Sequence, residues 1–290
     1  MKSGATGHAG LRSRISQWFG SLELLVGILL FAVVLILIVF RTQLQTHDPY
    51  VGDLLERFSG IGVGGHLLGT DNLGRDVWSR LLEGIRWSVF AAVIATLIAF
   101  VLGTVIGLIA AQFPGRVRTL LNQVVDMALA FPSLIIAIIV VAVIGRGFWP
   151  LTITLGLVSW PVFARVVFAE SLTLLERDYV IAARAFGARP AAILFGHVLP
   201  GIRPTVTVVL AFHFADMLVA ESALSFLGLG APLGVPTWGN LLQESRVYML
   251  VAPWLLAVPS AGIIYAVVTV NLIGDGLSSI ARRKGLRVDL

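Results

Sequence analysis

Six long apolar runs dominate this 290-residue sequence. A helix needs about 20 consecutive, mostly apolar residues to cross the hydrocarbon core of a bilayer. The runs cover residues 22–40, 88–111, 120–144, 151–168, 205–227 and 251–273. The chain is 57% hydrophobic and only 13% charged, far from the usage of a soluble domain. The sequence therefore predicts an all-α polytopic membrane protein with about six transmembrane helices.

The segment before the first run, residues 1–21, has the pattern of an amphipathic helix. Leu11, Ile15, Trp18 and Phe19 recur at helical spacing and are flanked by arginines. Such a pattern suits a helix that lies in the membrane interface. A cleaved signal peptide is the alternative, but the apolar run is too long and no small-residue cleavage site follows it. The segment is therefore interpreted as a tail with an interfacial helix.

Basic residues divide the connecting segments into two groups. They are concentrated in the N-terminal tail, in the turn after the second run, in residues 176–200 and in the tail at 277–290. Because positive segments stay inside, both termini and residues 176–200 are predicted to be cytoplasmic. Five arginines from Arg41 to Arg86 strain this rule, but six acids offset them. The predicted organisation is a first span at 22–41, an extracytoplasmic segment at 42–87 and a five-helix core at 88–276.

The cytoplasmic segment 176–200 is expected to begin with a short helix. Tyr179, Ala183 and Phe186 lie at i, i+4 and i+7, so they share one apolar face. The small side chains of Ala182 and Ala183 would let another surface approach closely. Gly187 is expected to end the helix, since glycine adopts the left-handed conformation at little steric cost.

A second short helix is expected to follow. Pro190 suits its first turn, and the helix is expected to end at Leu199. Pro200 and Pro204 are expected to interrupt the chain before the fifth span. The two helices would form a platform that projects from the membrane and contacts a partner. The alternative is a surface loop that lies on the lipid headgroups.

The extracytoplasmic segment is predicted to form a compact cap. Turn-forming residues crowd into eight positions, and arginines alternate with acids around them, which favours internal ion pairs. A structural turn with a docking role for a binding protein is the preferred interpretation. The residues expected to carry that role are Gly69, Asp71, Gly74, Arg75 and Asp76.

A metal site is the sharper alternative for this segment. It would use His66 with Asp71 and Asp76. The chain has no cysteine and offers no second histidine close to His66 in the sequence, so a soft-ligand cluster is missing. No metal site is therefore predicted.

Four ionisable residues fall inside or beside the apolar runs. They are Asp126, His213, Asp216 and Glu221. Ionisable side chains are costly at membrane depth and are functional candidates by default. Two interpretations stay open, because such groups either bond neighbouring helices or line a translocation pathway. His213 and Asp216 share a helical face, but two residues do not make a proton relay across a membrane.

Glycines and prolines inside the runs predict local geometry. Gly103 and Gly107 form a GxxxG pair, which favours close helix packing. Pro132, Pro161 and Pro259 are expected to break or kink the third, fourth and sixth spans.

Catalytic motifs are missing from the sequence. ATP-binding P-loops need a lysine after glycine, and neither of the two lysines follows a glycine. G-x-S-x-G and H-E-x-x-H are absent as well, so a membrane-embedded enzyme has no supporting constellation. A non-catalytic chain is predicted, and its energy source must lie on another subunit.

One segment resembles the EAA loop of bacterial ABC importer permeases. "AARAFG" followed by "HVLP" matches that pattern at Ala182, Ala183, Gly187, Leu199 and Pro200. Ile181 departs from it, since the family usually has glutamate at that position. An apolar side chain there still suits a hydrophobic cleft.

Three further regions resemble the permease branch for dipeptides, oligopeptides and nickel. They are "HLLGTDNLGRDVWSRLLEGIRWS", then "LSFLGLG" with "PTWGNLL", and finally "NLIGDGL". With the EAA-like loop they occur in family order, and the resemblance as a whole covers nearly all the chain after about Leu22.

The resemblance implies a fold, a set of partners and a location. The fold would be the type I ABC importer permease fold in a bacterial inner membrane. The chain would pair with a homologous permease as a heterodimer, bind two ATPase subunits that hold ATP and Mg²⁺, and receive solute from an extracytoplasmic binding protein. It would bind no cofactor and no nucleic acid itself. Peptides are the implied cargo, and nickel or another small solute is the alternative.

A secondary transporter driven by an ion gradient is the rival from another class. It would predict two homologous halves with broken helices at matching positions, and no inverted repeat is visible. An ABC permease is therefore the preferred interpretation.

Overall fold

The structure, a computed structural model, describes residues 6–232 and 234–283, with side chains from Leu22 to Ala281 apart from residue 233. Within this part of the chain all regular elements are helical, and two isolated β-bridges, Gly52–Arg75 and Thr70–Asp76, hold the loop before the second long helix. The elements in chain order are α1 (Thr6–Val39), α2 (Arg41–Leu44), η1 (Leu54–Glu56), α3 (Val77–Gln112), α4 (Arg116–Leu129), α5 (Ser133–Ile144), α6 (Phe148–Leu175), α7 (Asp178–Ala185), α8 (Pro190–Ile193), η2 (Leu194–Val198), α9 (Leu199–Phe226), α10 (Trp238–Ser245), η3 (Arg246–Tyr248) and α11 (Trp254–Arg283).

Five helices in the described chain are long and apolar enough to cross a membrane, namely α1, α3, α6, α9 and α11. The helices α4 and α5, bent by 82° at their junction, count as a sixth candidate span if the pair is one broken span rather than a re-entrant loop. The predicted third span, 120–144, is therefore not one continuous helix. Pro132 lies at this break, as expected, because its ring and its missing N–H interrupt the helical hydrogen bonds. Pro161 and Pro259, by contrast, lie inside the unbroken helices α6 and α11.

Several helices extend beyond the predicted apolar runs. α3 begins at Val77 rather than at residue 88, because Asp76 caps it by accepting a hydrogen bond from the Ser79 N–H over 2.8 Å. α11 continues to Arg283, so the predicted tail at 277–290 is helical as far as the structure describes it. The predicted interfacial segment is continuous with α1 from Thr6 onward, while its side chains lie outside the described residues.

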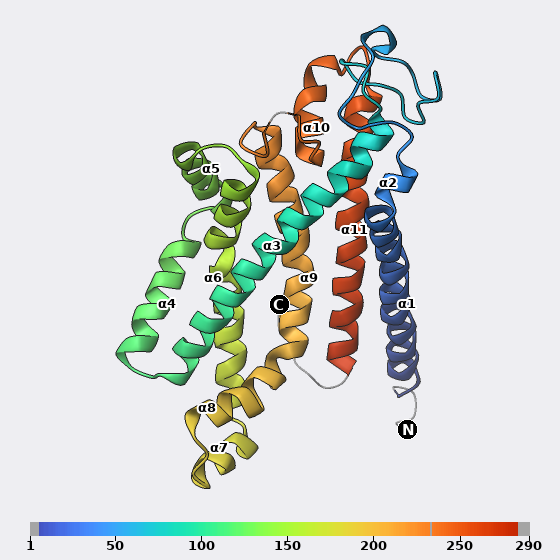
Figure 1. Ribbon diagram of the computed structural model, residues 1–290. Helices are drawn as coiled ribbons and strands as arrows, with labels where there is room; N and C mark the ends of the chain where they lie inside the picture. The colour runs from blue at the N-terminus through green and yellow to red at the C-terminus, as the bar shows by residue number, and fades with distance from the viewer. Residues whose placement is uncertain (1–5, 233, 284–290) are drawn as a thin grey trace.

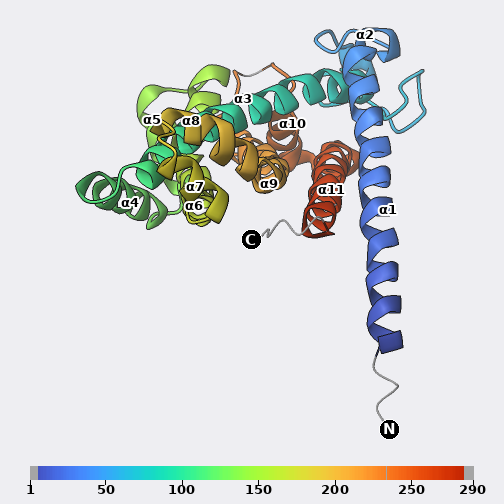
Figure 2. The same ribbon diagram turned by 90° about the horizontal axis from the view of Figure 1, so that it is seen from below.

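The loops sort to two ends of the bundle. In Figure 1 the start of α1, the α7–α8 region and the end of α11 lie at the lower end. The loop between α2 and α3 and the helix α10 lie at the upper end. Figure 2 shows that the first turns of α1 project away from the other helices. This is the sorting that the charge pattern predicts, and the assignment of the lower end to the cytoplasm stays a prediction.

The closest helix packing joins α3 to α6. Ala92, Ala95 and Ala99 on α3 are fully buried. A Cβ atom added at Gly103 would collide with the Trp160 carbonyl oxygen. Small residues let the two backbones approach closely, which confirms the packing role predicted for the GxxxG pair.

Candidate functional site

The turn between α7 and α8 is a Schellman motif. The Ala188 N–H donates to the Ala183 carbonyl and the Gly187 N–H donates to the Arg184 carbonyl, each over 3.0 Å. Gly187 has a φ of 83°, in the left-handed region that glycine adopts without a steric penalty. The predicted helix end is therefore confirmed. Residues Asp178–Val198, that is α7, the turn, α8 and η2, form the platform.

Buried aliphatic side chains hold the platform rigidly on the bundle. Val180, Ile193 and Val198 are at most 1% exposed. They belong to one apolar cluster with Val167 of α6 and Ile202 of α9. The platform is thus fixed to both helices between which it lies, so a displacement of the platform would move α6 and α9.

The opposite face of the platform exposes apolar side chains. Phe186 is 92% exposed and Phe195 is 69% exposed, while Tyr179 and Ile181 are each about half exposed. Tyr179, Ala183 and Phe186 do share a face, as the spacing predicts, but it points away from the bundle. The residue that anchors α7, Val180, was not predicted. Large exposed apolar side chains of this kind are typical of a surface that contacts another protein or the membrane.

The second half of the platform differs from the prediction. The chain does not stop at Leu199 and Pro200, because α8, η2 and α9 form one helical path. η2 is a π-helical turn, in which the Leu199 N–H donates to the Leu194 carbonyl. Pro200 has no N–H to donate, and the wider turn directly before it fits that missing donor. Leu199 packs into the anchoring cluster.

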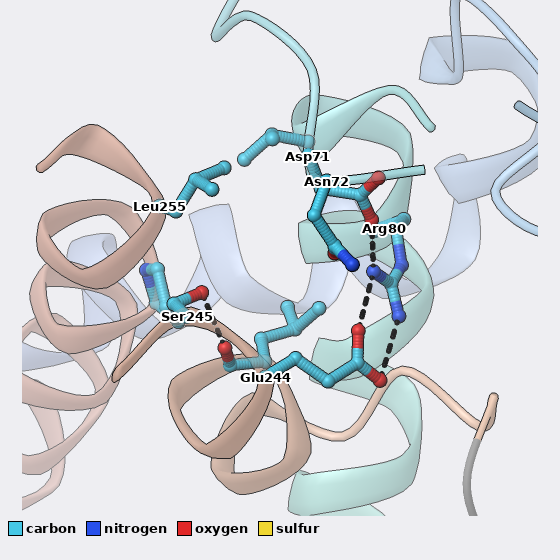
Figure 3. Close-up of a pocket in the computed structure, with 9 residues that line it drawn as sticks. Asp71, Asn72, Arg80, Glu244, Ser245 and Leu255 are labelled. Carbon is cyan, nitrogen blue, oxygen red and sulfur yellow. Dashed lines mark hydrogen bonds and ion pairs between the residues drawn. The ribbon is translucent and has the colours of Figure 1, made fainter. Parts of the chain in front are cut away.

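The loop at the upper end is tied to α10 by a buried ion network (Figure 3). Arg80 donates to Glu244 through both terminal nitrogens, over 2.9 and 3.3 Å, and also pairs with Asp71. Arg75 joins the same two acids, each over 2.7 Å. Arg80 is only 1% exposed. The predicted ion pairing within the loop is confirmed, and the link to Glu244, 164 residues away from Arg80, was not predicted.

The residues predicted to contact a partner are instead buried within this loop. Asp71, Arg75 and Asp76 are all at most 8% exposed. Gly74 has a φ of 72°, and a Cβ atom there would collide with the Asp53 backbone. Gly69 likewise has a positive φ. Their geometry assigns these five residues to shaping the loop rather than to direct contact with a partner.

Apolar side chains cover the outside of the same loop. The sequence analysis did not predict this apolar surface, although the high hydropathy of these residues in a loop could have indicated it. The most exposed are Val51, Leu54, Leu55, Ile61 and Val63, between 56% and 94%.

A second polar cluster lies beneath this surface, around His66. Its Nδ1 is 2.9 Å from Asp76 Oδ1 and its Nε2 is 3.0 Å from Glu56 Oε2. Burial alone would lower the pKa of His66, but the hydrogen bonds to Glu56 and Asp76 outweigh it and raise the pKa above its ordinary value. Burial opposes the ionised form of Asp76 too, and the hydrogen bonds from Ser79, His66 and Thr46 nevertheless lower its pKa. The structure also brings His47 to this cluster, with its ring centroid 4.3 Å from that of His66.

Two of the four predicted membrane residues are packed inside the chain. Glu221 is 1% exposed and accepts a hydrogen bond from the Ser225 hydroxyl over 2.8 Å. His213 is 4% exposed and lies edge-on to the ring of Phe163, 4.8 Å away. Asp216 is exposed on α9, so it does not share the buried environment of His213. The packing interpretation fits Glu221 and His213.

Asp126 forms an exposed ion pair with Arg165. The pair joins α4 to α6, and the side chains are 57% and 45% exposed. Arg165 was not predicted, although an arginine within an apolar run is a detectable signal. An exposed ion pair within a span is unfavourable against lipid, so this face must meet water or another subunit.

Comparison with known proteins gives one family. Residues 103–284 match the family described as "Binding-protein-dependent transport system inner membrane component". This range contains the platform, the Asp126–Arg165 pair and the α9–α11 region.

Curated relatives cover most of the chain. The glutathione transport system permease protein of Pectobacterium atrosepticum is 36% identical over 249 residues, which is 86% of this chain and 83% of that protein. The dipeptide transport system permease protein of Alkalihalophilus pseudofirmus is 32% identical over 87% of this chain and 83% of its own length. The di/tripeptide transport system permease protein of Pseudomonas aeruginosa is 35% identical over 87% and 84%.

Proposed function

This chain belongs to the binding-protein-dependent transport system inner membrane components, and on that premise we propose that it is a permease subunit of an ATP-driven ABC importer. The observation that carries the proposal is the platform, which is anchored rigidly on α6 and α9 and exposes aromatic side chains beyond the bundle. Such a surface suits a partner subunit that binds the platform and displaces it. The chain itself performs no chemical step, and ATP and Mg²⁺ are held by the ATPase subunits.

Peptides are the proposed cargo. The relatives from Pectobacterium atrosepticum, Alkalihalophilus pseudofirmus and Pseudomonas aeruginosa are named for glutathione, dipeptides and di/tripeptides, all of them small peptides. They match this chain over at least 86% of its length. A nickel complex or another small solute is the alternative cargo for the same machinery.

The proposed assembly has four kinds of subunit. The chain pairs with a homologous permease across a shared pathway, and two ATPase subunits bind inside, one of them on the platform. An extracytoplasmic binding protein delivers the solute at the upper end, where the exposed apolar surface around Leu54, Leu55 and Ile61 is available for docking. This orientation places both chain ends and the platform in the cytoplasm of the bacterial cell.

The proposed mechanism is a shift between two conformations. ATP binding favours the closed ATPase dimer, and closure displaces each platform. Because Val180 and Ile193 fix the platform to the cluster that contains Val167 and Ile202, the displacement reaches α6 and α9 as a rigid movement. Packed helices switch between discrete arrangements rather than deform continuously, so the pathway opens to one side or the other.

The Asp126–Arg165 pair is proposed to line that pathway. We expect Arg165→Cys to react with a charged, membrane-impermeant thiol reagent in the assembled importer, because water reaches a face that lines the pathway. The chain has no native cysteine, so no background has to be removed from it. Mass spectrometry of this chain gives the rate of labelling, and a transported dipeptide should slow it.

Leu29→Cys is the matched control for that experiment. Leu29 is 59% exposed in the middle of the apolar helix α1, where lipid is the expected neighbour. Its labelling should be much slower than at position 165. Equally slow labelling at positions 165 and 29 would place the ion pair at an interface without water and contradict a pathway role.

Uptake by the reconstituted importer tests the proposed function itself. Proteoliposomes that contain this permease and its partner subunits are expected to accumulate a labelled dipeptide only under two conditions. ATP must be enclosed in the lumen, on the side of the ATPase subunits, and the binding protein must be present outside. Collapse of the ion gradient with ionophores should leave the rate unchanged. Uptake that needs the gradient and not ATP would instead identify a secondary transporter.

A further inference from the structure

We propose that the loop at the upper end holds one divalent transition-metal ion, of the zinc type, between His47, His66 and Asp76. The three residues come from separate parts of the chain. His47 follows α2, His66 lies in the long loop, and Asp76 caps α3. A bound ion would therefore fasten this loop to the start of a transmembrane helix.

The ligand atoms already lie close to one another. One ligand atom from each residue falls within 4.8 Å of the others. Asp76 Oδ1 is 2.9 Å from His66 Nδ1 and 3.8 Å from His47 Nδ1. Zinc–ligand bonds of about 2.0–2.1 Å in a tetrahedron place ligand atoms roughly 3.3 Å apart. A small rotation of the His47 ring closes the site, and this side chain has room to turn because it is 42% exposed.

Other polar groups hold the ligands in the orientation that a metal requires. A metal-bound imidazole typically donates its second N–H to a carboxylate. Glu56 is placed for this role, with Oε2 at 3.0 Å from His66 Nε2, so that Nδ1 is the nitrogen left for the ion. Asp76 Oδ2 accepts hydrogen bonds from the Ser79 N–H and the Thr46 hydroxyl, over 2.8 and 3.0 Å. This leaves Oδ1 directed at the two histidines.

The donor set identifies the class of ion. Two imidazoles and one carboxylate suit zinc and its neighbours, whereas calcium and magnesium prefer shells of oxygen ligands. The acids Asp76 and Glu56 supply two negative charges against one dication. The exposed side of His47 leaves an entry path and a fourth position for water. An ion pair without metal, with His66 protonated between its two acids, is the competing state that the experiment must exclude.

Zinc binding by the assembled importer tests this inference. After washing with a chelator, the wild-type complex in nanodiscs is titrated with zinc chloride by calorimetry, and bound zinc is counted by elemental mass spectrometry. We expect one zinc more per chain than in His47→Ala, and a thermal midpoint of this chain that rises with zinc in the wild type but not in His47→Ala. Glu56→Gln, which keeps an oxygen acceptor, should weaken binding about 10–100-fold.

His197→Ala is the control variant. His197 lies on the platform at the opposite end of the molecule, so its replacement should leave the zinc count unchanged. His47→Ala should keep the wild-type thermal midpoint in the absence of metal, because the His47 side chain is 42% exposed and fills no buried core position. The inference is overturned if the wild type binds no more zinc than His47→Ala, since the cluster would then be an ion pair only.

Discussion

Phe186→Asp is expected to release the ATPase subunit from the platform and to stop uptake. Phe186 is 92% exposed next to the turn of the platform, and no other large apolar side chain of α7 or its turn is as accessible. Aromatic residues at the centre of an interface often contribute 2 kcal/mol or more to binding, so the ATPase should bind at least about 30-fold more weakly. A buried carboxylate without a partner would weaken it further. Co-purification of the ATPase and ATP-dependent uptake measure the two effects.

The fold should survive this substitution, and a matched variant makes that testable. Phe186 follows α7 as its C-cap, and the hydrogen bonds of that turn use backbone atoms alone. Leu55→Asp introduces the same charge at an apolar residue that is 94% exposed in η1. The loop between α2 and α3, to which η1 belongs, lies at the opposite end of the molecule (Figure 1). Leu55→Asp should retain the ATPase. If both variants retained the ATPase equally well, the platform would not be the site of docking.

Arg80→Met is expected to destabilise the upper end of the bundle by about 3 kcal/mol. The guanidinium of Arg80 lies between Asp71 and Glu244 and is almost fully buried. Removing one partner from a buried network leaves charges without compensation. The cost stands at the low end of the usual range, because Arg75 still contacts both acids. For this 290-residue chain, an unfolding entropy of about 2.1 cal/mol/K per residue means that the thermal midpoint should fall by about 5 °C.

Arg86→Met is the control for the loss of stability expected of Arg80→Met. Arg86 pairs with Glu83 over 3.5 Å, but its side chain is 46% exposed, so the change should cost less than about 1 kcal/mol. Replacing Arg80 and Glu244 together by methionine and leucine should recover stability, since both charges leave the buried site. Equal midpoints for Arg80→Met and Arg86→Met would show that the network in Figure 3 does not hold the loop.

Local features of this chain follow from its sequence. The apolar runs predict the long helices, because a helix needs about 20 consecutive apolar residues to span a bilayer. Gly187 predicts the end of α7, and the Schellman hydrogen bonds show why, since they require a residue with positive φ at that point. Gly103 and Gly107 predict a closely packed face on α3 for an equally local reason, and the structure shows that α6 packs there.

Pairings between distant residues were not predictable in the same way. Glu244 meets Arg80 and His47 meets His66 only after α3, α10 and the loop have packed. Periodicity placed Tyr179 and Phe186 on one face but could not say which face is buried, because that depends on Val180 meeting α6 and α9. The bend of 82° between α4 and α5 is likewise set by packing, although Pro132 marks its position.

Crosslinking from the platform tests the central proposal most directly. Phe186→Cys supplies the single cysteine of this chain, and a short bifunctional thiol reagent should join it to the ATPase in the assembled importer. The proposal predicts one covalent product that contains this chain and the ATPase, formed from position 186 and not from Leu55→Cys. A complex that transports peptide yet gives no such product, while position 186 remains reactive toward the reagent, would contradict it.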